Sequence, residues 1–439
     1  MTKRRQSAGR ESGMLMGSGA DDLKGTSTVK PGAWKALILL TAMMTFNQID
    51  RRVASLVIEP LKHEFMLSDA QLGMLTGLAF GLIYAVTSIP LGLVADRVNR
   101  SRMLAIVVAV WSAMTAMAGI AFTYGHLLLT RVGVGAAESG ASPTATSIIT
   151  DLFPRDRRAS AVAIYQTGIP LGSLLCFIAG AWIVTHYGWR AAFMAAGLPG
   201  VPLALLIWLF LREPVRGAFD QKAPAYDAPW NKRLADAFRF IGRDTRVLLL
   251  MIGAALLSAA NTGVTGWFVP FLMREHMMSI QGAGMVIAFA SGICGGIGLI
   301  FTGTLADRLA KGEPNRMLIL CGSIALLTML FAAGALMAPS IALTVLAISG
   351  YSLFCYSFLG ISYGALLNLT PASIRGTVIA VEMVMANLFG YGGGPFVVGL
   401  LSDTYGGPHS LKSAMLTLNL FYLAGAVCFI AAGRLRKTA

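Results

Sequence analysis

Six ionisable side chains lie inside otherwise apolar stretches of this sequence, and they are the first candidates for chemistry. A charged side chain at the middle of a membrane costs about 2.5 kcal/mol or more, so a residue of this kind is by default a functional candidate. Two carboxylates and three guanidiniums fall in the first third of the chain, and one further carboxylate falls towards its end: Asp50, Arg51, Arg52, Arg131, Glu138 and Glu382.

The spacing of these residues predicts a charge cluster. Arg131 and Glu138 are seven residues apart, which places them close to one face of a helix with a rise of about 10 Å between them. Asp50 falls at a depth between the two in its own apolar stretch. We therefore expect Asp50, Arg51 and Arg52 to lie near Arg131 and Glu138.

Such a cluster can couple two binding events. Whether a buried carboxylate holds a proton depends on whether a neighbouring arginine is engaged elsewhere. If an anionic substrate binds the arginine, the carboxylate loses its partner and takes up a proton, so proton and anion binding become linked. The alternative is a permanent ion pair that only holds two helices together.

Membrane-spanning helices must position these residues. The chain of 439 residues is 56% hydrophobic and 13% charged, with a mean hydropathy of +0.68, which excludes a disordered or nucleic-acid-binding protein. A helix that spans a bilayer needs about 20 apolar residues. Twelve runs qualify, at roughly 34–58, 71–94, 103–123, 127–149, 159–184, 190–211, 246–273, 280–305, 316–337, 340–369, 376–401 and 411–433.

The basic residues predict the orientation in the membrane. Of the 35 Lys and Arg, 28 fall in the tails and loops on the side of the N-terminus, and 4 fall on the other side. By the positive-inside rule both termini lie in the cytoplasm, which for a bacterial protein means the inner membrane. The basic loops also attract anionic membrane lipids. The five cysteines fall within spans, and their odd number and spacing predict no disulfide framework or metal site.

The chain contains an internal repeat. The segment from Gly92 to Arg97 recurs as Gly303 to Arg308, an offset of 211 residues. Six spans in each half enter the membrane from the same side, so the predicted fold is all-α, with twelve transmembrane helices in two six-helix bundles. The predicted domains are a disordered cytoplasmic tail (1–33), an N-terminal bundle (34–211), a cytoplasmic linker (212–245), a C-terminal bundle (246–433) and a cytoplasmic tail (434–439).

The linker carries an amphipathic segment. Trp230, Leu234, Ala237, Phe238 and Ile241 share one helical face, which predicts an interfacial helix on the inner leaflet. The alternative is a solvated linker.

The motif Gly92-x-x-x-Asp96-Arg97-x-Asn99-Arg100-x-Arg102, with its copy at Gly303, resembles the loop motif of the major facilitator superfamily. Gly188-Trp189-Arg190 and Arg212-Glu213-Pro214 are further matches. The resemblance implies two bundles that rock about a central cavity, opened alternately to each side. It also implies a conformational latch, made of Gly92, Asp96, Arg97, Arg100, Asp307 and Arg308.

A narrower resemblance is to the spinster branch of that superfamily. It rests on Asn47-x-x-Asp50-Arg51 and on Arg131-x-x-x-Gly135-x-x-Glu138. It implies a proton-linked carrier of an amphipathic anionic lipid such as a lysophospholipid or sphingolipid. Asp50 and Glu138 would then handle protons, and Arg51 and Arg131 would pair with those carboxylates or with the head group. Arg52 departs from the residue expected in that branch.

The C-terminal half adds weaker candidates. Glu382 joins the substrate-binding candidates, and Asn261 could contact either the substrate or another helix. The predicted cavity lining consists of Phe354, Phe358, Tyr363 and Met385; Met adapts to a flexible chain.

Other function classes fit the sequence less well. No nucleophile, metal or dinucleotide motif marks an enzyme, and we expect no cofactor and no nucleic-acid partner. The alternatives left open are a proton-coupled carrier of a soluble organic anion and an exporter of amphipathic drugs. We expect a monomer.

Overall fold

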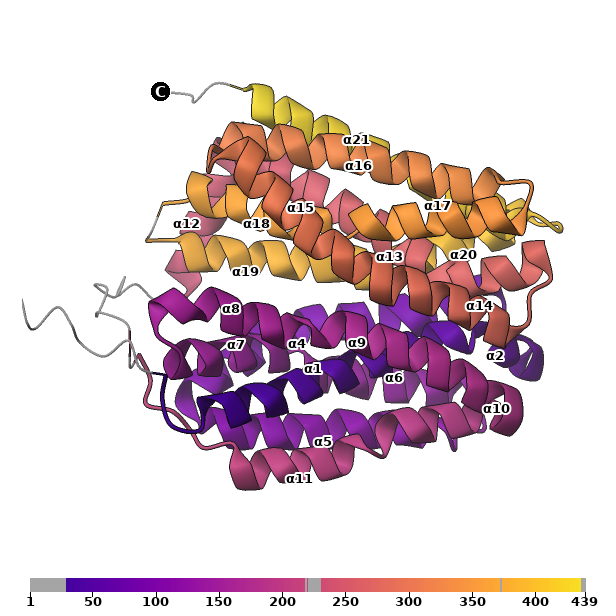
Figure 1. Ribbon diagram of the computed structural model, residues 1–439, viewed down its shortest axis with the longest axis horizontal. Helices are drawn as coiled ribbons and strands as arrows, with labels where there is room; N and C mark the ends of the chain where they lie inside the picture. Colours follow the sequence, from indigo (N-terminus) through magenta and orange to yellow (C-terminus); the bar gives the residue numbers. More distant parts are fainter. Residues whose placement is uncertain (1–28, 218, 220–229, 372, 436–439) are drawn as a thin grey trace, which may run out of the picture.

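A computed structural model describes residues 29–217, 219, 230–371 and 373–435, and every regular element in these ranges is helical. Figure 1 shows two bundles of antiparallel helices lying against each other. The N-terminal bundle contains α1 (Ala33–Leu56), α2 (Ile58–Phe65), α3 (Asp69–Gly73), η2 (Met74–Leu78), α4 (Ala79–Arg97), α5 (Arg100–Ala118), α6 (Tyr124–Glu138), α7 (Ala141–Leu152), α8 (Arg155–Gln166), α9 (Gly168–Leu175), η3 (Cys176–Gly180), α10 (Ala181–Gly197) and α11 (Gly200–Phe210).

The second bundle follows a short connecting helix, α12 (Trp230–Arg243). The C-terminal bundle contains α13 (Thr245–His276), α14 (Ile280–Ile287), η4 (Ala288–Cys294), α15 (Gly295–Ala310), α16 (Pro314–Met337), α17 (Ile341–Phe354), α18 (Ser357–Leu369), α19 (Arg375–Met385), η5 (Ala386–Gly393), α20 (Gly394–Tyr405) and α21 (Ser410–Arg434).

The described helices account for twelve spans, as predicted. Nine are long and apolar enough to cross a membrane by themselves, and one of these, Asp156–Phe210, makes two spans because it contains a sharp kink at Gly188, where φ is 81°. The charged residues of α1 and the break between α6 and α7 leave those two spans outside the nine. The fold class predicted from the sequence is therefore confirmed.

Local sequence explains where several helices begin. Side-chain oxygens accept hydrogen bonds from first-turn backbone N–H groups that have no partner within the helix. The caps are Ser68 at α3, Asn99 at α5, Thr123 at α6, Asp244 at α13, Ser279 at α14 and Ser340 at α17.

The repeat is visible in the backbone as well as in the sequence. The described part of the chain contains four π-helical segments, which fall in the second, fifth, eighth and eleventh spans. η2 starts 214 residues before η4, at Met74 and Ala288, and η3 starts 210 residues before η5, at Cys176 and Ala386. Both offsets lie within three residues of the 211-residue offset of the sequence repeat. η2 and η5 pack against each other, as do η3 and η4, so these irregular turns lie where the two bundles meet.

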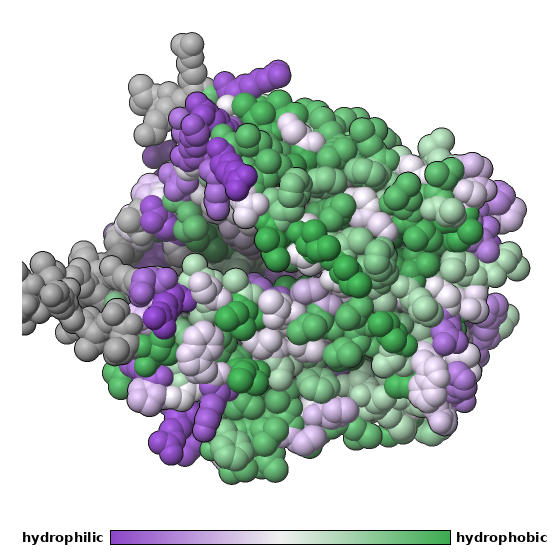
Figure 2. All heavy atoms as spheres, viewed as in Figure 1, coloured by the Kyte–Doolittle hydropathy of each residue, from purple (hydrophilic) through white to green (hydrophobic). Residues whose placement is uncertain are grey.

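The bundles are closed at one end and apart at the other. α1 begins and α21 ends at the same end of the molecule, which we call the terminus side, and the opposite end is the far side (Figure 1). One buried apolar cluster continues from the far-side half of the N-terminal bundle into the C-terminal bundle, from Leu56 and Phe177 to Trp267 and Phe271. Figure 2 shows the surface hollowed between the bundles towards the terminus side.

The connecting helix α12 packs on the C-terminal bundle. It contacts α13 and α19, and Ala237 and Ile241 of the face assigned to lipid are buried, whereas Phe238 is 56% exposed. Protein therefore covers part of the face that we had expected to lie on the leaflet. The side chain of Trp230, residues 220–229 and the tail 1–28 lie outside the described part of the chain.

Candidate functional site

Arg51 and Glu138 form a buried ion pair in the N-terminal bundle. Nε of Arg51, in α1, lies 2.8 Å from Oε2 of Glu138, at the end of α6, and the Glu138 side chain has no solvent exposure. The guanidinium lies 5.0 Å from the ring centroid of Phe80, 5.1 Å from that of Tyr84 and 4.9 Å from that of Tyr391. Cation–π attraction to three rings adds to the ion pair. Tyr391 belongs to the C-terminal bundle, so this arginine also connects the two bundles.

Asp50 and Arg131 lie beside this pair but bind each other differently from the prediction. Nη1 of Arg131 donates to the backbone carbonyl of Asp50 at 3.3 Å, and its guanidinium lies 5.5 Å from the Phe80 ring. The Asp50 side chain is buried, and neither of its oxygens accepts a hydrogen bond from the described residues. Thr115 of α5 is a polar neighbour. Asp50 is therefore a carboxyl group without a fixed donor.

Arg52 points away from the other four residues. Nη2 of Arg52 donates to the hydroxyl of Tyr356 at 2.5 Å, and Tyr356 lies between α17 and α18 of the opposite bundle. The expected group of five therefore divides. Asp50, Arg51, Arg131 and Glu138 interact with one another, and Arg52 faces the C-terminal bundle.

A small cavity reaches the Arg51–Glu138 pair. Its volume is about 10 Å³, which is space for about one water molecule. Polar groups at its wall include Asn47, Ser142 and Tyr165, and the hydroxyls of the last two are 3.2 Å apart. Met43 and Met44 supply apolar wall. These hydroxyls border the space beside the buried pair.

Glu382 is a second isolated carboxyl group. It lies in α19 and is 2% exposed, and neither oxygen accepts a hydrogen bond in the described chain. The phenol of Tyr363 in α18 is its polar neighbour. Glu382 therefore does not join the cluster of the N-terminal bundle.

Asn261 and the aromatic candidates of the C-terminal bundle have packing partners. Oδ1 of Asn261 accepts a hydrogen bond from the hydroxyl of Tyr351 at 3.0 Å, so the amide contacts another helix. Phe354 stacks on Phe331 with centroids 6.0 Å apart. Phe358 is a buried core residue, and Met385 packs against the same core.

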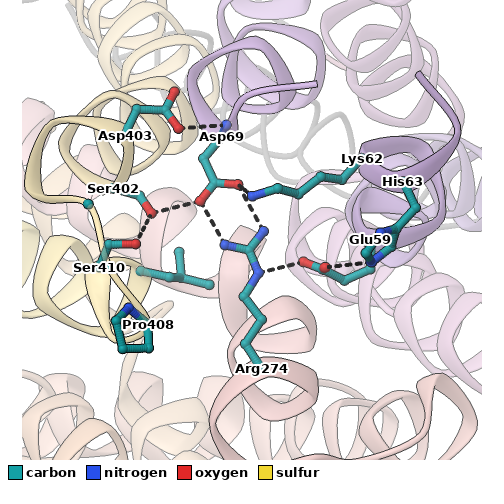
Figure 3. Close-up of a pocket in the computed structure, with 12 residues that line it drawn as sticks. Glu59, Lys62, His63, Asp69, Arg274, Ser402, Asp403, Pro408 and Ser410 are labelled. Atoms are coloured by element: carbon teal, nitrogen blue, oxygen red, sulfur yellow. Dashed lines mark hydrogen bonds and ion pairs between the residues drawn. The ribbon is translucent and has the colours of Figure 1, made fainter. Parts of the chain in front are cut away.

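A polar network joins the two bundles on the far side (Figure 3). Arg274 of α13 forms two bonds with Asp69 of α3, at 2.7 and 2.8 Å, and a third with Glu59 of α2, at 2.8 Å. Lys62 contacts Asp69 at 2.6 Å, and Ser402 of α20 donates to it at 2.7 Å. We call these residues, with Asp403, the far-side network. A cavity of about 510 Å³ lies beside it.

Asp403 completes the far-side network through backbone groups. Its two carboxylate oxygens accept hydrogen bonds from the N–H groups of Asp69 and Ala70, at 2.9 and 2.8 Å. These N–H groups belong to the first turn of α3, whose end carries partial positive charge. A carboxylate from one bundle therefore caps a helix of the other.

Glycines allow the helices of the two bundles to pack closely against each other where η2 and α4 meet η5. A Cβ added at Gly77 would lie 2.9 Å from the carbonyl oxygens of Tyr391 and Gly392, and one at Gly81 would overlap the backbone of Gly392. On the other side of the molecule, a Cβ at Gly284 would lie 2.8 Å from the carbonyl oxygen of Phe177. Side chains larger than hydrogen would keep the bundles apart.

Most residues of the predicted latch do not bridge the bundles in this conformation. Arg97, Asp307 and Arg308 are exposed, Gly92 has open space around it, and the side chain of Asp96 lies outside the described part. Arg100 is buried and binds Asp151 at 2.6 Å and Glu213 at 2.7 Å, both within or next to its own bundle. Arg100 therefore holds the end of one bundle together.

Sequence reasoning missed the far-side network and the rings around Arg51. Charged residues at helix ends are ordinary, so Asp69 and Arg274 did not stand out, although the Ser68-Asp69 cap was a usable signal for a helix start. Phe80, Tyr84 and Tyr391 are common residues of apolar spans and carry no signal. The described residues contain no group of three or more His, Cys, Asp or Glu that could hold a metal ion.

The chain is similar to known proteins in both sequence and fold. Residues 40–390 match the family model described as Major Facilitator Superfamily. The chain is 32% identical to an MFS-type efflux pump of Mycolicibacterium smegmatis, over 92% of this chain and 94% of the relative. It is 25% identical to a probable L-galactonate transporter of Escherichia coli, over 90% of this chain and 88% of the relative. The chain also resembles a solved structure of a bacterial homologue of the human lysosomal transporter spinster, in an inward-facing and unoccupied conformation. The two superpose with a TM-score of 0.80 and are 28% identical, over 93% of this chain and 98% of the homologue.

Proposed function

Because the chain belongs to the major facilitator superfamily, we propose that it is a proton-coupled carrier of an amphipathic anion that works by alternating access. The proposed substrate class is a single-chain lipid with an anionic head group, such as a lysophospholipid or sphingolipid. The observation that carries the proposal is the buried Arg51–Glu138 pair beside Asp50, whose carboxyl group has no hydrogen-bond donor among the described residues.

The coupling step follows from the charges. Glu138 stays ionised while Arg51 binds it, because the guanidinium compensates a charge that burial penalises. An anion that approaches Arg51 competes with Glu138 for the same N–H donors. Once Arg51 turns to the anion, Glu138 accepts a proton, and the two ligands bind in a linked manner. Asp50 is the second proton acceptor in this scheme.

The conformational cycle follows from the far-side network. We assign the terminus side to the cytoplasm of a bacterial inner membrane, in line with the 28 basic residues on that side. The conformation described is then open inward and closed outward. Separation of Arg274 from Asp69 opens the outward side, and the exposed Arg97, Asp307 and Arg308 become available to latch the inward side. The molecule acts as a monomer with one translocation path between its bundles.

A lipid substrate is favoured by the similarity to spinster proteins and by apolar groups near the charges. Met43 and Met44 line the cavity at Arg51, and we assign the partly exposed Tyr363 and Met385 to the wall of the translocation path, with Phe354 and Phe358 behind them. Flexible thioethers and aromatic rings suit an acyl chain better than a sugar. The similarity to an efflux pump and to a galactonate transporter supports the alternatives, namely an exporter of amphipathic drugs or a carrier of a soluble organic anion.

Thermal unfolding of the purified protein with a ligand panel tests the proposal. A ligand that binds only the folded state raises the midpoint by mass action. The panel contains lysophosphatidylglycerol, sphingosine phosphate, galactonate and a cationic drug, each at two pH values, on the wild type and on Glu138→Gln. Glu313→Gln, an exposed carboxylate on the C-terminal bundle, is the matched control.

We expect the phosphate-bearing lipids to raise the midpoint of the wild type and of Glu313→Gln more at the lower pH. In Glu138→Gln the rise should no longer depend on pH, because the neutral amide leaves Arg51 free for the anion at both pH values. A rise with galactonate alone, or with the drug alone, would replace the lipid by one of the alternatives. A lipid response in Glu138→Gln that depends on pH as strongly as in the wild type would contradict the coupling mechanism.

A further inference from the structure

The three buried arginines of the N-terminal bundle are engaged to different degrees. Arg51 has a carboxylate at 2.8 Å and three rings around it, and Arg131 has the carbonyl of Asp50 and the ring of Phe80. Arg52 is 9% exposed, and its one hydrogen bond within the described chain goes to the neutral phenol of Tyr356. Arg52 is thus the least compensated cation of the group.

The charges of the group do not balance. Three guanidiniums accompany two carboxylates, and both carboxylates lie on the side of Arg51 and Arg131. A guanidinium has five N–H donors, and Arg52 uses one of them. A phenol hydroxyl accepts a hydrogen bond but neutralises no charge. Burial of a cation without a counterion is unfavourable, so the site is short of one anion.

Arg52 lies at the boundary between the two bundles. It starts from α1, and the groups that interact with it come from both sides: Cys176 of η3 from its own bundle, and Cys355, Tyr356 and Tyr391 from the other. An anion bound to Arg52 therefore contacts helices of both bundles at once. Binding there affects how the bundles sit against each other, which is what a transported molecule must do.

We propose that Arg52 binds the anionic group of the transported molecule together with Arg51, since Tyr391 is a neighbour of both guanidiniums. The Tyr356 hydroxyl accepts a hydrogen bond from Arg52 while the site is empty, and turns to donate to the anion when it arrives. A phosphate or carboxylate accepts two parallel N–H bonds from the planar guanidinium, which a lysine cannot offer. This inference rests on the proposed function, because it requires an anionic substrate.

Binding measurements on variants of Arg52 test the inference. The probes are oleoyl lysophosphatidylglycerol and galactonate, which carry an anion on a lipid and on a soluble acid, and monooleoylglycerol, which has the acyl chain without the anion. The proteins are the wild type, Arg52→Gln, Arg52→Lys and Arg239→Gln. Arg239 is an exposed arginine of α12 and controls for the loss of one positive charge.

We expect Arg52→Gln to weaken binding of the anionic probe about tenfold to a hundredfold, as expected for the loss of a charge-assisted hydrogen bond, and to leave monooleoylglycerol unaffected. Arg52→Lys should recover part of the loss, and Arg239→Gln should bind as the wild type does. Without ligand, the unfolding midpoint of Arg52→Gln should equal or exceed that of the wild type, because an uncompensated charge is removed. The probe whose affinity falls in Arg52→Gln, the lipid or the sugar acid, identifies the source of the anion.

Three results would overturn the inference. Equal affinity of Arg52→Gln and the wild type for the anionic probe removes Arg52 from the site and leaves the proposed function intact. A lowered midpoint without ligand, together with weaker binding of all probes including monooleoylglycerol, assigns Arg52 a structural role. Failure of every anionic probe to bind the wild type removes the proposed function itself, and this inference with it.

Discussion

Arg274 and Asp69 form a two-point ion pair between the two bundles. Nη1 of Arg274 lies 2.7 Å from Oδ2 of Asp69, and Nη2 lies 2.8 Å from Oδ1. The Asp69 side chain is 3% exposed and that of Arg274 is 19% exposed. Parallel N–H bonds from one guanidinium to one carboxylate are both strong and directional. This pair therefore sets the distance between α3 and α13 on the far side.

Removal of this pair should open the far side. Asp69→Asn leaves Arg274 with a weaker partner, which costs about 2 kcal/mol or more for a buried charge pair and changes the ratio of closed to open molecules by roughly thirtyfold. Spin labels at Phe122 and Met277, which are 77% and 86% exposed on different bundles, report the distance. In Asp69→Asn we expect a larger fraction of molecules to show a longer distance between the two labels. The control Arg190→Gln removes an arginine whose partner Glu64 lies in its own bundle, and it should leave the distribution as it is.

Of two glycines in α4, only one should be sensitive to replacement by alanine. Gly81→Ala places a methyl group against the backbone of Gly392 and should destabilise the closed far side by about 1–3 kcal/mol through overpacking, whereas Gly92 has open space around its Cα. The same spin-label pair should show opening in Gly81→Ala and the wild-type distribution in Gly92→Ala. An unchanged distribution in both variants would mean that the helices can shift to accept the methyl group.

Arg51 and Glu138 should show strong energetic coupling. Either Arg51→Gln or Glu138→Gln leaves an uncompensated buried charge, which costs about 3–5 kcal/mol. The double variant removes both charges and should recover much of this loss. Midpoints of thermal unfolding in detergent for the four proteins give the coupling. Additive effects would show that the 2.8 Å contact contributes little to stability.

Glu382→Gln should behave differently from Glu138→Gln. The Glu382 carboxylate forms no ion pair in the described chain, and its polar neighbour is the neutral phenol of Tyr363, so the neutral amide removes a potential charge and can keep that neighbour. We expect the unfolding midpoint to stay level or rise, while that of Glu138→Gln falls. A fall of several degrees in Glu382→Gln would reveal a partner that this conformation lacks.

Glu64 should make a pH-dependent contribution to stability. Hydrogen bonding from Arg190 lowers the pKa of Glu64, and the indole N–H of Trp189 donates to the same carboxylate at 2.6 Å. A lowered pKa in the folded state means that stability is present above the ordinary glutamate value of about 4.3 and is lost as the pH falls through the folded value. The midpoint of Glu64→Gln should lie below that of the wild type at pH 7, and the two should converge in acid. A gap that persists in acid would exclude ionisation as its cause.

The sequence determined the spans, the repeat and the candidate charges, because each depends on local order along the chain. A helix crosses the membrane if about 20 consecutive residues are apolar, whatever its neighbours are. Asp50, Glu138 and Glu382 were found for the same reason, since a carboxylate within an apolar run is visible without a structure. The repeat at Gly92 and Gly303 needed only a comparison of the chain with itself.

Partners were decided by the tertiary structure alone. Arg51 and Arg52 are adjacent in the chain, yet one binds Glu138 of its own bundle and the other binds Tyr356 of the opposite bundle. Successive residues of a helix point about 100° apart, so the rotation of α1 about its axis chooses between these outcomes. Asp69 and Arg274 are 205 residues apart and meet because the two bundles dock at the far side. Hydropathy is a property of each segment, but rotation and docking are set by how all the helices pack together.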